Sequence, residues 1–194
     1  MPKVVDPEAR RRELAESVWR VIRRDGLEHA SVRNVAREAG LSMGSLRHYF
    51  ATQSELLAFA MRLVHERVQR RIAALDLSGD PRQVVERALQ EALPLDAERH
   101  AEMEVWLAFT ARALVDPKLR ALRDEGHSKL RELCRRCVEA LARRPGLDVA
   151  AEAERLHALI DGLALHRVLD PATTTPQRVV ELLAAHLDEL AGQA

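Results

Sequence analysis

The chain of 194 residues has few aromatic residues and few cysteines: three phenylalanines, two tryptophans, one tyrosine and two cysteines. Two cysteines do not form a disulfide framework, but a chain of this length can bury a core without one, as one large domain or as a small domain joined to a larger one. No apolar run approaches the roughly 18 residues that a membrane span needs, and no apolar segment precedes the charges at the N-terminus. We therefore expect a cytoplasmic protein without a membrane partner.

The chain also lacks net charge, because 30 lysines and arginines balance 30 aspartates and glutamates. This balance argues against a protein that coats nucleic acid by bulk attraction. The charges are unevenly distributed: residues 1–50 carry ten basic and seven acidic residues, and residues 51–194 carry twenty and twenty-three. A P-loop, a nucleotide-binding glycine motif and a nucleophile elbow are all missing, so we expect neither an enzyme nor a cofactor.

Stretches of alternating apolar and polar residues, the pattern of half-buried strands, are missing as well. Apolar residues instead recur at helical spacing almost throughout, which predicts an all-α fold of about nine helices. Asp80, Asp116 and Thr175 each precede a proline, as a capping residue precedes the first position of a helix. We expect three short helices in residues 1–50 and longer helices after them.

The segment SVRNVAREAGLSMGSLRHYF, residues 31–50, contains two short helical patterns on either side of a glycine. Ser31 and Ser42 stand where side chains cap helix N-termini, and Gly40 stands where a helix ends in the left-handed conformation. Two helices that cross steeply through a short turn form a helix-turn-helix, whose second helix enters the major groove of DNA. This segment therefore predicts a DNA-binding head.

The second helix of this head carries side chains suited to DNA. Gly44 would let the backbone approach DNA closely, and Ser45 can donate hydrogen bonds to phosphates or bases. The guanidinium group of Arg47 has the geometry to donate to O6 and N7 of guanine. Tyr49 is placed to donate to a phosphate, and with Leu46 and Phe50 it is also expected to return an apolar group to the core. The expected DNA-binding residues are Ser31, Arg33, Ser42, Met43, Gly44, Ser45, Arg47, His48, Tyr49 and Gln53.

From residue 8 to about residue 57 the sequence closely resembles the DNA-binding domain of TetR-type transcriptional regulators, in which a three-helix head ends in an aromatic pair and a fourth helix follows. The resemblance implies a helix-turn-helix domain over residues 1–54 and a helical ligand-binding and dimerisation domain over residues 55–194. It further implies a ligand-responsive repressor that binds a pseudo-palindromic DNA operator as a homodimer, through the last two helices at about 149–191.

Three residues depart from the pattern of that family. Arg47 stands where the family commonly has a tyrosine, Gln53 where it commonly has a lysine, and Met43 where a polar residue is frequent. We expect one fewer charged phosphate contact and one additional base reader, which would alter the operator sequence but not DNA binding itself.

The last two helical segments carry apolar stripes that must be covered by something. The stripe residues are Leu156, Leu159, Ile160 and Leu163, followed by Val179, Val180, Leu183, Leu187 and Leu190. The resemblance implies that the stripes of two subunits cover each other. The alternative is that they line the core of a single chain, because an interface and a core have the same pattern in a sequence.

A binding site for a small-molecule effector of unknown identity is expected around the segment MEVWLAFTARAL, which gathers aromatic rings, a methionine and a hydroxyl within a few turns. Three histidines are expected on neighbouring helices. The expected ligand-binding residues are Met103, Trp106, Phe109, Thr110, His65, His127 and His166. The alternative for this set is ordinary core packing.

Two other kinds of regulator stay open. Cys134 and Cys137 lie three residues apart in a helical pattern, and a redox- or metal-sensing regulator could use both thiols. A ligand-independent architectural DNA binder is the other alternative. His157 and Asp161 lie one helical turn apart and could share a metal, but no third ligand stands at a suitable spacing, so no metal site is expected.

Overall fold

In the computed structural model, which describes residues 7–142 and 146–192, the chain forms α-helices joined by short turns. The described helices are α1 Pro7–Asp25, η1 Leu27–His29 (a 3-10 turn), α2 Val32–Glu38, α3 Met43–Arg47, α4 Gln53–Ala73, α5 Pro81–Gln90, α6 Ala97–Val115, α7 Pro117–Leu141, α8 Val149–Leu169 and α9 Pro176–Ala191. Neither described range contains a strand, so the prediction of an all-α fold with about nine helices is confirmed. Within these ranges, no helix combines the length and the apolarity that crossing a membrane would require.

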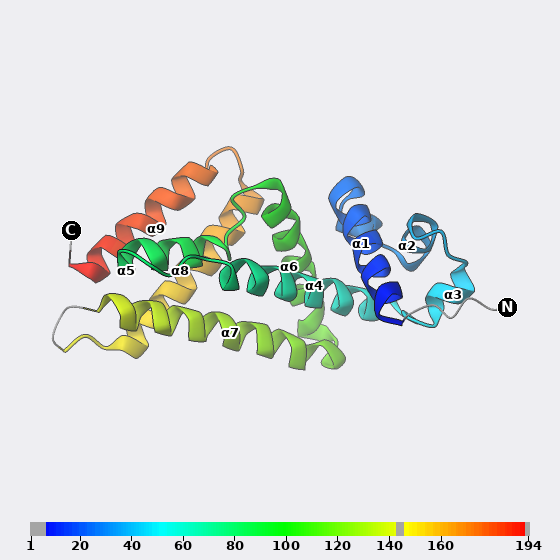
Figure 1. Ribbon diagram of the computed structural model, residues 1–194, viewed down its shortest axis with the longest axis horizontal. Coiled ribbons are helices and arrows are strands. Elements are labelled where there is room, and N and C mark those ends of the chain that lie inside the picture. Colours follow the sequence, from blue (N-terminus) through cyan, green and yellow to red (C-terminus); the bar gives the residue numbers. More distant parts are fainter. Residues whose placement is uncertain (1–6, 143–145, 193–194) are drawn as a thin grey trace.

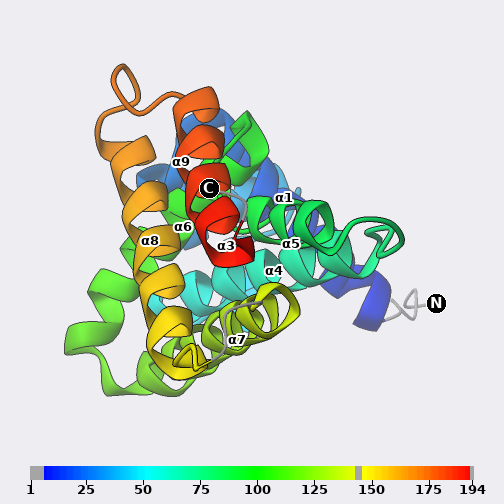
Figure 2. The same cartoon turned by 90° about the vertical axis from the view of Figure 1, so that its left-hand side faces the viewer.

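The helices form a small head and a larger body that share α4. Helices α1 to α3 lie together at one end, and α4 runs from this head into the body formed by α5 to α9 (Figure 1). Within the body, α7 packs on α8, and α9 packs on α5 and α8, so that α8 and α9 are neighbours in the view along the long axis (Figure 2). The head is therefore joined to the body by a continuous helix as well as by packing.

Side-chain caps define where the helices begin. The side chains of Asp80, Asp116 and Thr175 accept hydrogen bonds from backbone N–H groups of the following turns, as their positions before proline predict. Comparable caps stand at Ser31, Ser42, Thr52, Asp96 and Asp148. Each cap satisfies a backbone donor that the helix leaves free, and so fixes the start of a helix locally.

The first helix is longer than the sequence analysis predicted. Helix α1 spans 19 residues, so the expectation of three short helices in residues 1–50 is wrong for this one. Its apolar side chains at Leu14, Val18 and Ile22 are buried against the rest of the head, and α1 contacts α2, α4 and α6. With this length, α1 contacts α6 of the body as well as the rest of the head.

Two apolar clusters make up the core. The first joins α1 to α3 with α4 and continues into α6 through Val105 and Phe109. The second gathers α5 to α9. Trp106 packs against both clusters, and the guanidinium of Arg67 on α4 lies 4.3 Å from the ring centroid of Trp19 on α1. The head and the body therefore share packed side chains, so a displacement of one would displace side chains of the other.

The apolar stripes of α8 and α9 belong to the core of the single chain. Seven of the nine stripe residues are buried against the chain itself, namely Leu156, Ile160, Leu163, Val179, Leu183, Leu187 and Leu190. Leu159 and Val180 are half-buried. The interpretation that these seven residues are covered by a second subunit is wrong, because α7 and α5 already cover them.

Candidate DNA-binding head and effector cavity

The turn between α2 and α3 has the geometry of a helix-turn-helix. The hydroxyl of Ser31 accepts from the backbone N–H of Asn34 at 3.2 Å, and that of Ser42 accepts from Ser45 at 3.0 Å. Gly40 between the helices has φ 63°, the left-handed conformation expected there. A residue with a side chain would be strained at this angle, which explains why glycine ends the first helix.

Helix α3 is held to the head by one side of its surface. Leu46 is fully buried, and Phe50 packs on Phe59 of α4 with ring centroids 4.9 Å apart. Tyr49, by contrast, keeps 47% of its surface exposed, so the expectation that it packs in the core is wrong. It lies beside Phe50, whose ring occupies the inward position, and its hydroxyl is left available at the surface.

Nine of the ten expected DNA-binding residues are exposed, and Ser31 is half-buried. They lie on α2, on α3 with its flanking turns, and at the start of α4. The side chains of Arg33, Arg47 and His48 make no hydrogen bond or ion pair with another described residue. These three groups are therefore available to an external partner, whereas salt bridges occupy many other arginines of the chain.

Besides Ser31, which caps α2, three of the expected DNA-binding residues have roles within the chain. The amide nitrogen of Gln53 donates to the carbonyl oxygen of Ala30 at 2.9 Å, which ties the start of α4 to the end of η1. The hydroxyls of Ser42 and Ser45 lie 2.9 Å apart. Gly44 has no such role, because a Cβ added there would have only the Ser42 hydroxyl oxygen within 4 Å, at 3.8 Å.

The body contains a cavity of about 890 Å³ bounded by α4, α6, α7 and α8. Six of the seven expected ligand-binding residues line it, namely Met103, Trp106, Phe109, Thr110, His65 and His127. The seventh, His166, is exposed near the end of α8 and does not line the cavity. On α4, sequence reasoning identified His65 but missed Met61 and Val64, which also line the wall, because their spacing is that of any core helix.

Most carboxylates of the cavity wall are neutralised by arginines. Arg71 reaches Glu91 at 2.7 Å and Glu102 at 2.6 Å, although Glu102 is almost fully buried. Asp124 pairs with Arg123 at 2.6 Å, and Glu132 pairs with two arginines of its own helix. Asp161 differs, because its partner among the described residues is a histidine.

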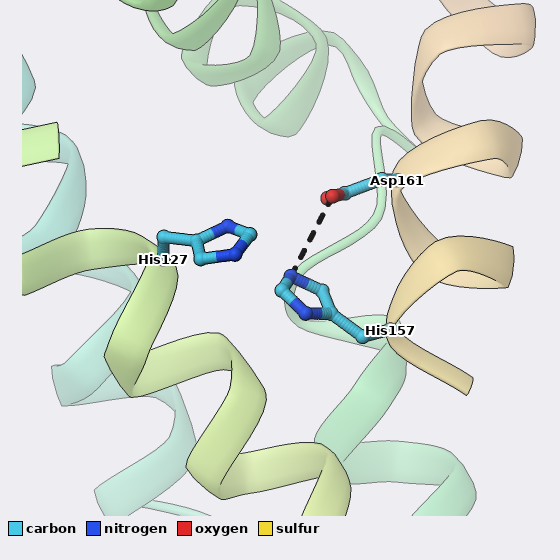
Figure 3. Close-up of side chains that lie close together, drawn as sticks. All are labelled: His127, His157 and Asp161. Carbon is cyan, nitrogen blue, oxygen red and sulfur yellow. Dashed lines mark ion pairs between the residues drawn. The ribbon is translucent and has the colours of Figure 1, made fainter. Parts of the chain in front are cut away.

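That histidine, His157, and Asp161 meet a third side chain, His127 (Figure 3). His157 Nε2 lies 3.5 Å from Asp161 Oδ2, and the rings of the two histidines have centroids 4.5 Å apart. The expectation that no third ligand stands near His157 and Asp161 is therefore wrong. His127 comes from α7, whose packing against α8 cannot be read from spacing along one helix.

Burial alters the proton affinities of these cavity groups. It lowers the pKa of His157 and of His65 below the usual histidine value, and it raises the pKa of Asp161, which the two neighbouring histidines oppose. Each direction reflects the cost of holding a charge away from water. His157 therefore favours its neutral form at neutral pH.

The two cysteines are buried side by side on α7. Burial raises the pKa of the Cys134 thiol to about 12 and that of Cys137 to about 12. A thiol must lose its proton to react or to bind a metal strongly, so this setting disfavours both. The geometry favours a packing role for Cys134 and Cys137 over redox sensing.

Comparison with known proteins agrees with this architecture. Residues 16–59 match the family described as bacterial regulatory proteins, tetR family, and residues 81–192 match the BetI-type transcriptional repressor C-terminal family. The chain belongs to the TetR family. The TetR-family resemblance of residues 8–57 is thus confirmed and extends through the body.

Several relatives of this TetR-family protein match it over nearly their whole length. The HTH-type transcriptional regulator PksA of Bacillus subtilis (strain 168) is 46% identical, with 98% of this chain and 94% of PksA covered. A Rhodococcus transcriptional regulator of known structure is 31% identical with a TM-score of 0.80, covering 94% of this chain and 96% of that one. A regulator from Saccharomonospora viridis, solved in complex with choline, is 25% identical with a TM-score of 0.77, covering 96% and 97%.

Together, the head and these relatives identify the protein as a DNA-binding transcriptional regulator of the TetR family, and not an enzyme.

Proposed function

We propose that this TetR-family regulator is a ligand-responsive repressor in the cytoplasm, which binds a pseudo-palindromic operator as a homodimer and releases it when a small molecule occupies the cavity. The observation that carries the proposal is the course of α4, which starts in the head and ends in the cavity wall. An effector that changes the cavity would act on the head through this helix.

The two ends of α4 are attached to different parts of the molecule. At its start, Gln53 is hydrogen-bonded to Ala30 and Leu56 is buried in the head cluster. Further along, Met61, Val64 and His65 face the cavity. Because the helix is continuous and packed at both ends, a displacement of its second half would tilt or shift the head.

Helix α6 supplies a second connection. Phe109 is almost fully buried in the cluster that includes the head, and the same ring lines the cavity. An effector that binds one arrangement of α4 and α6 better than the other would lower operator affinity. By linkage, operator DNA would lower effector affinity by the same factor.

The proposed effector is a small organic molecule with a largely apolar surface. Met103, Trp106 and Phe109 offer it an apolar wall, and Thr110 offers a hydroxyl. The choline complex of the Saccharomonospora viridis regulator supports the idea that a domain of this shape holds a small organic ligand. We further propose that residues 1–54 are the DNA-binding domain and residues 55–194 the effector-binding and dimerisation domain.

The proposed dimer uses the outer faces of α8 and α9, within about 149–191, because the inner faces are buried in the chain. Ala158, Leu169 and Ala185 are exposed there, and Leu165 is half-buried. Small side chains would let two copies of α8 approach closely, and burial of Leu165 and Leu169 would supply the apolar contact. Such a pair would present two copies of α3 to two half-sites.

DNA binding can be tested by fluorescence anisotropy with the duplex upstream of the gene for this protein, with scrambled duplex as competitor and at two salt concentrations. We expect binding that survives the competitor, a stoichiometry of two chains per site, and affinity that falls steeply with salt. Equal and weak affinity for both duplexes would contradict sequence-specific repression at this site.

Effector binding can be tested by screening small molecules for a rise in melting temperature, followed by operator titrations with each hit. We expect a hit to weaken operator binding in the wild type. Thr110→Phe, which adds a ring to the cavity, should abolish the response and keep DNA binding, whereas Ala111→Phe at the adjacent exposed position should change neither. A response that survives in Thr110→Phe would place the effector elsewhere.

A further inference from the structure

The cluster of His127, His157 and Asp161 lies at the edge of the cavity, where α7 meets α8. We propose that these three side chains form a binding site for a divalent transition-metal ion, with zinc as the reference metal. The inference goes beyond the proposed function, because it concerns a site for an inorganic ion and can be tested without DNA or an effector.

The three side chains stand close enough together to share one ion. One ligand atom from each of the three residues lies within 4.8 Å of the others. The separation of His157 Nε2 and Asp161 Oδ2 is 3.5 Å. Two ligands on a tetrahedral zinc ion, each at about 2.0–2.1 Å from it, stand about 3.4 Å apart. The pair thus already has the spacing of two zinc ligands, and His127 offers a third ligand atom within 4.8 Å of both.

His157 offers the site a buried ring nitrogen. The residue is 6% exposed, and its Nε2 has no hydrogen-bond partner among the described residues, because the approach to Asp161 lacks hydrogen-bond geometry. A buried polar atom without a partner costs free energy. Figure 3 shows this nitrogen on the side of the ring that faces Asp161. A metal ion there would give it a ligand bond.

Asp161 has a histidine, and no arginine or lysine, as its ion-pair partner among the described residues. The other carboxylates of the cavity wall pair with arginines. A half-buried carboxylate without an arginine or lysine partner would be stabilised by the positive charge of a divalent ion.

One group competes with the metal. The guanidinium of Arg131 lies 3.2 Å from His127 Nε2 and can donate to it. Arg131 is exposed, so it can turn away into solvent when a metal arrives. Its charge and its hydrogen bond nevertheless oppose metal binding, and replacing it should therefore tighten the site.

The ligand set indicates which metals fit. Two imidazoles and one carboxylate suit zinc and its neighbours in the first transition row, whereas calcium and magnesium prefer oxygen ligands only. Three protein ligands leave at least one coordination position open. Since His127, His157 and Asp161 all line the cavity, that position is accessible to water or to a small molecule in it.

The test uses the full-length protein after dialysis against a chelator. Zinc is titrated in competition with a chromophoric chelator, and cobalt is added separately so that its visible absorption reports the ligands. We expect one ion per chain. His127→Gln, His157→Gln and Asp161→Asn should each weaken binding at least about tenfold, since even indirect supports of a metal site are typically worth that much.

Two further variants sharpen the test. Arg131→Gln should bind zinc more tightly than the wild type, a gain that loss of folding cannot imitate. His166→Gln, at an exposed histidine on the same helix as His157, is the matched control and should leave affinity unchanged. Because His157 is buried, the stability of His157→Gln should be checked by thermal unfolding followed by circular dichroism. His127 is exposed, so the zinc affinity of His127→Gln is the result that decides the test.

Three results would overturn the proposal. The first is less than one zinc per chain in the wild type. The second is equal affinity in the wild type and His127→Gln. The third is near-ultraviolet charge-transfer absorption of cobalt that disappears in Cys134→Ala, which would assign the metal to the thiols instead.

Discussion

Gly44 offers a direct test of how the head approaches DNA, because its substitution should have opposite effects on stability and on binding. It is the second residue of α3, and a Cβ there would have one neighbouring atom, the Ser42 hydroxyl oxygen at 3.8 Å. Its φ is not positive, so nothing in the chain requires a glycine. Gly44→Ala should therefore be accepted by the fold.

The two magnitudes can be estimated from the structure. Alanine is favoured over glycine in a helix by about 0.5–1 kcal/mol, so the variant should be more stable by up to that amount. For a chain of this size the melting temperature should rise by about 1–4 °C. If the backbone at Gly44 makes a hydrogen bond to a phosphate, the added methyl group would cost about 1.5–3 kcal/mol in each head, or about 10- to 150-fold in affinity for each half-site.

The assays are thermal unfolding and anisotropy with operator duplex. Gly162→Ala on α8 is the matched control, since a Cβ there meets nothing within 4 Å. It should raise stability similarly and leave operator affinity unchanged, with oligomeric state checked by sedimentation. If Gly44→Ala binds operator as tightly as the wild type, the backbone at this position does not approach DNA. A drop in stability would instead refute the claim that the fold tolerates a side chain there.

Three further predictions concern single side chains. Arg47→Ala should weaken operator binding by about 1–3 kcal/mol and relax preference at one base position in each half-site, as measured with a set of substituted duplexes; unchanged preference would remove Arg47 from the base readers. Gln53→Lys should strengthen binding to every sequence and steepen the salt dependence, and a parallel log-log salt plot would contradict this. Burial lowers the pKa of His65 from 6.5, so the unfolded state binds the proton more readily and the free energy of unfolding should fall as pH drops below 6.5. Denaturant titrations at several pH values should show a weaker pH dependence in His65→Gln than in the wild type. An unchanged pH dependence would contradict the assignment of the effect to His65.

Features governed by neighbouring residues in the sequence were predictable. The caps at Asp116 and Thr175 and the left-handed turn at Gly40 follow from the chemistry of one or two residues, and the structure has them where the sequence predicts. The helix-turn-helix was predictable for the same reason, since its turn, its caps and its buried Leu46 fall within twenty residues.

Features that depend on which helices pack together were not predictable from spacing. The stripe of α9 shows this, because Leu183 and Leu187 have the same period whether a second subunit or α5 covers them. Likewise, His127 and His157 lie far apart in the sequence, and only the packing of α7 on α8 brings their rings together. Arg82 was also missed: it is buried on α5, where it pairs with Asp188 of α9, and a charged residue at helical spacing gives no sign of burial.

The separation between capping residues and cavity residues has a consequence for how this protein can change. None of the eight side chains that cap α2 to α9 lines the cavity. The residues that fix the start of each helix are therefore different from the residues that would contact an effector. Mutations at Trp106 or Thr110 can alter the shape of the cavity wall without removing a helix cap. A library restricted to the cavity should consequently yield many folded variants with altered ligand preference, which makes the body a suitable scaffold for an engineered sensor.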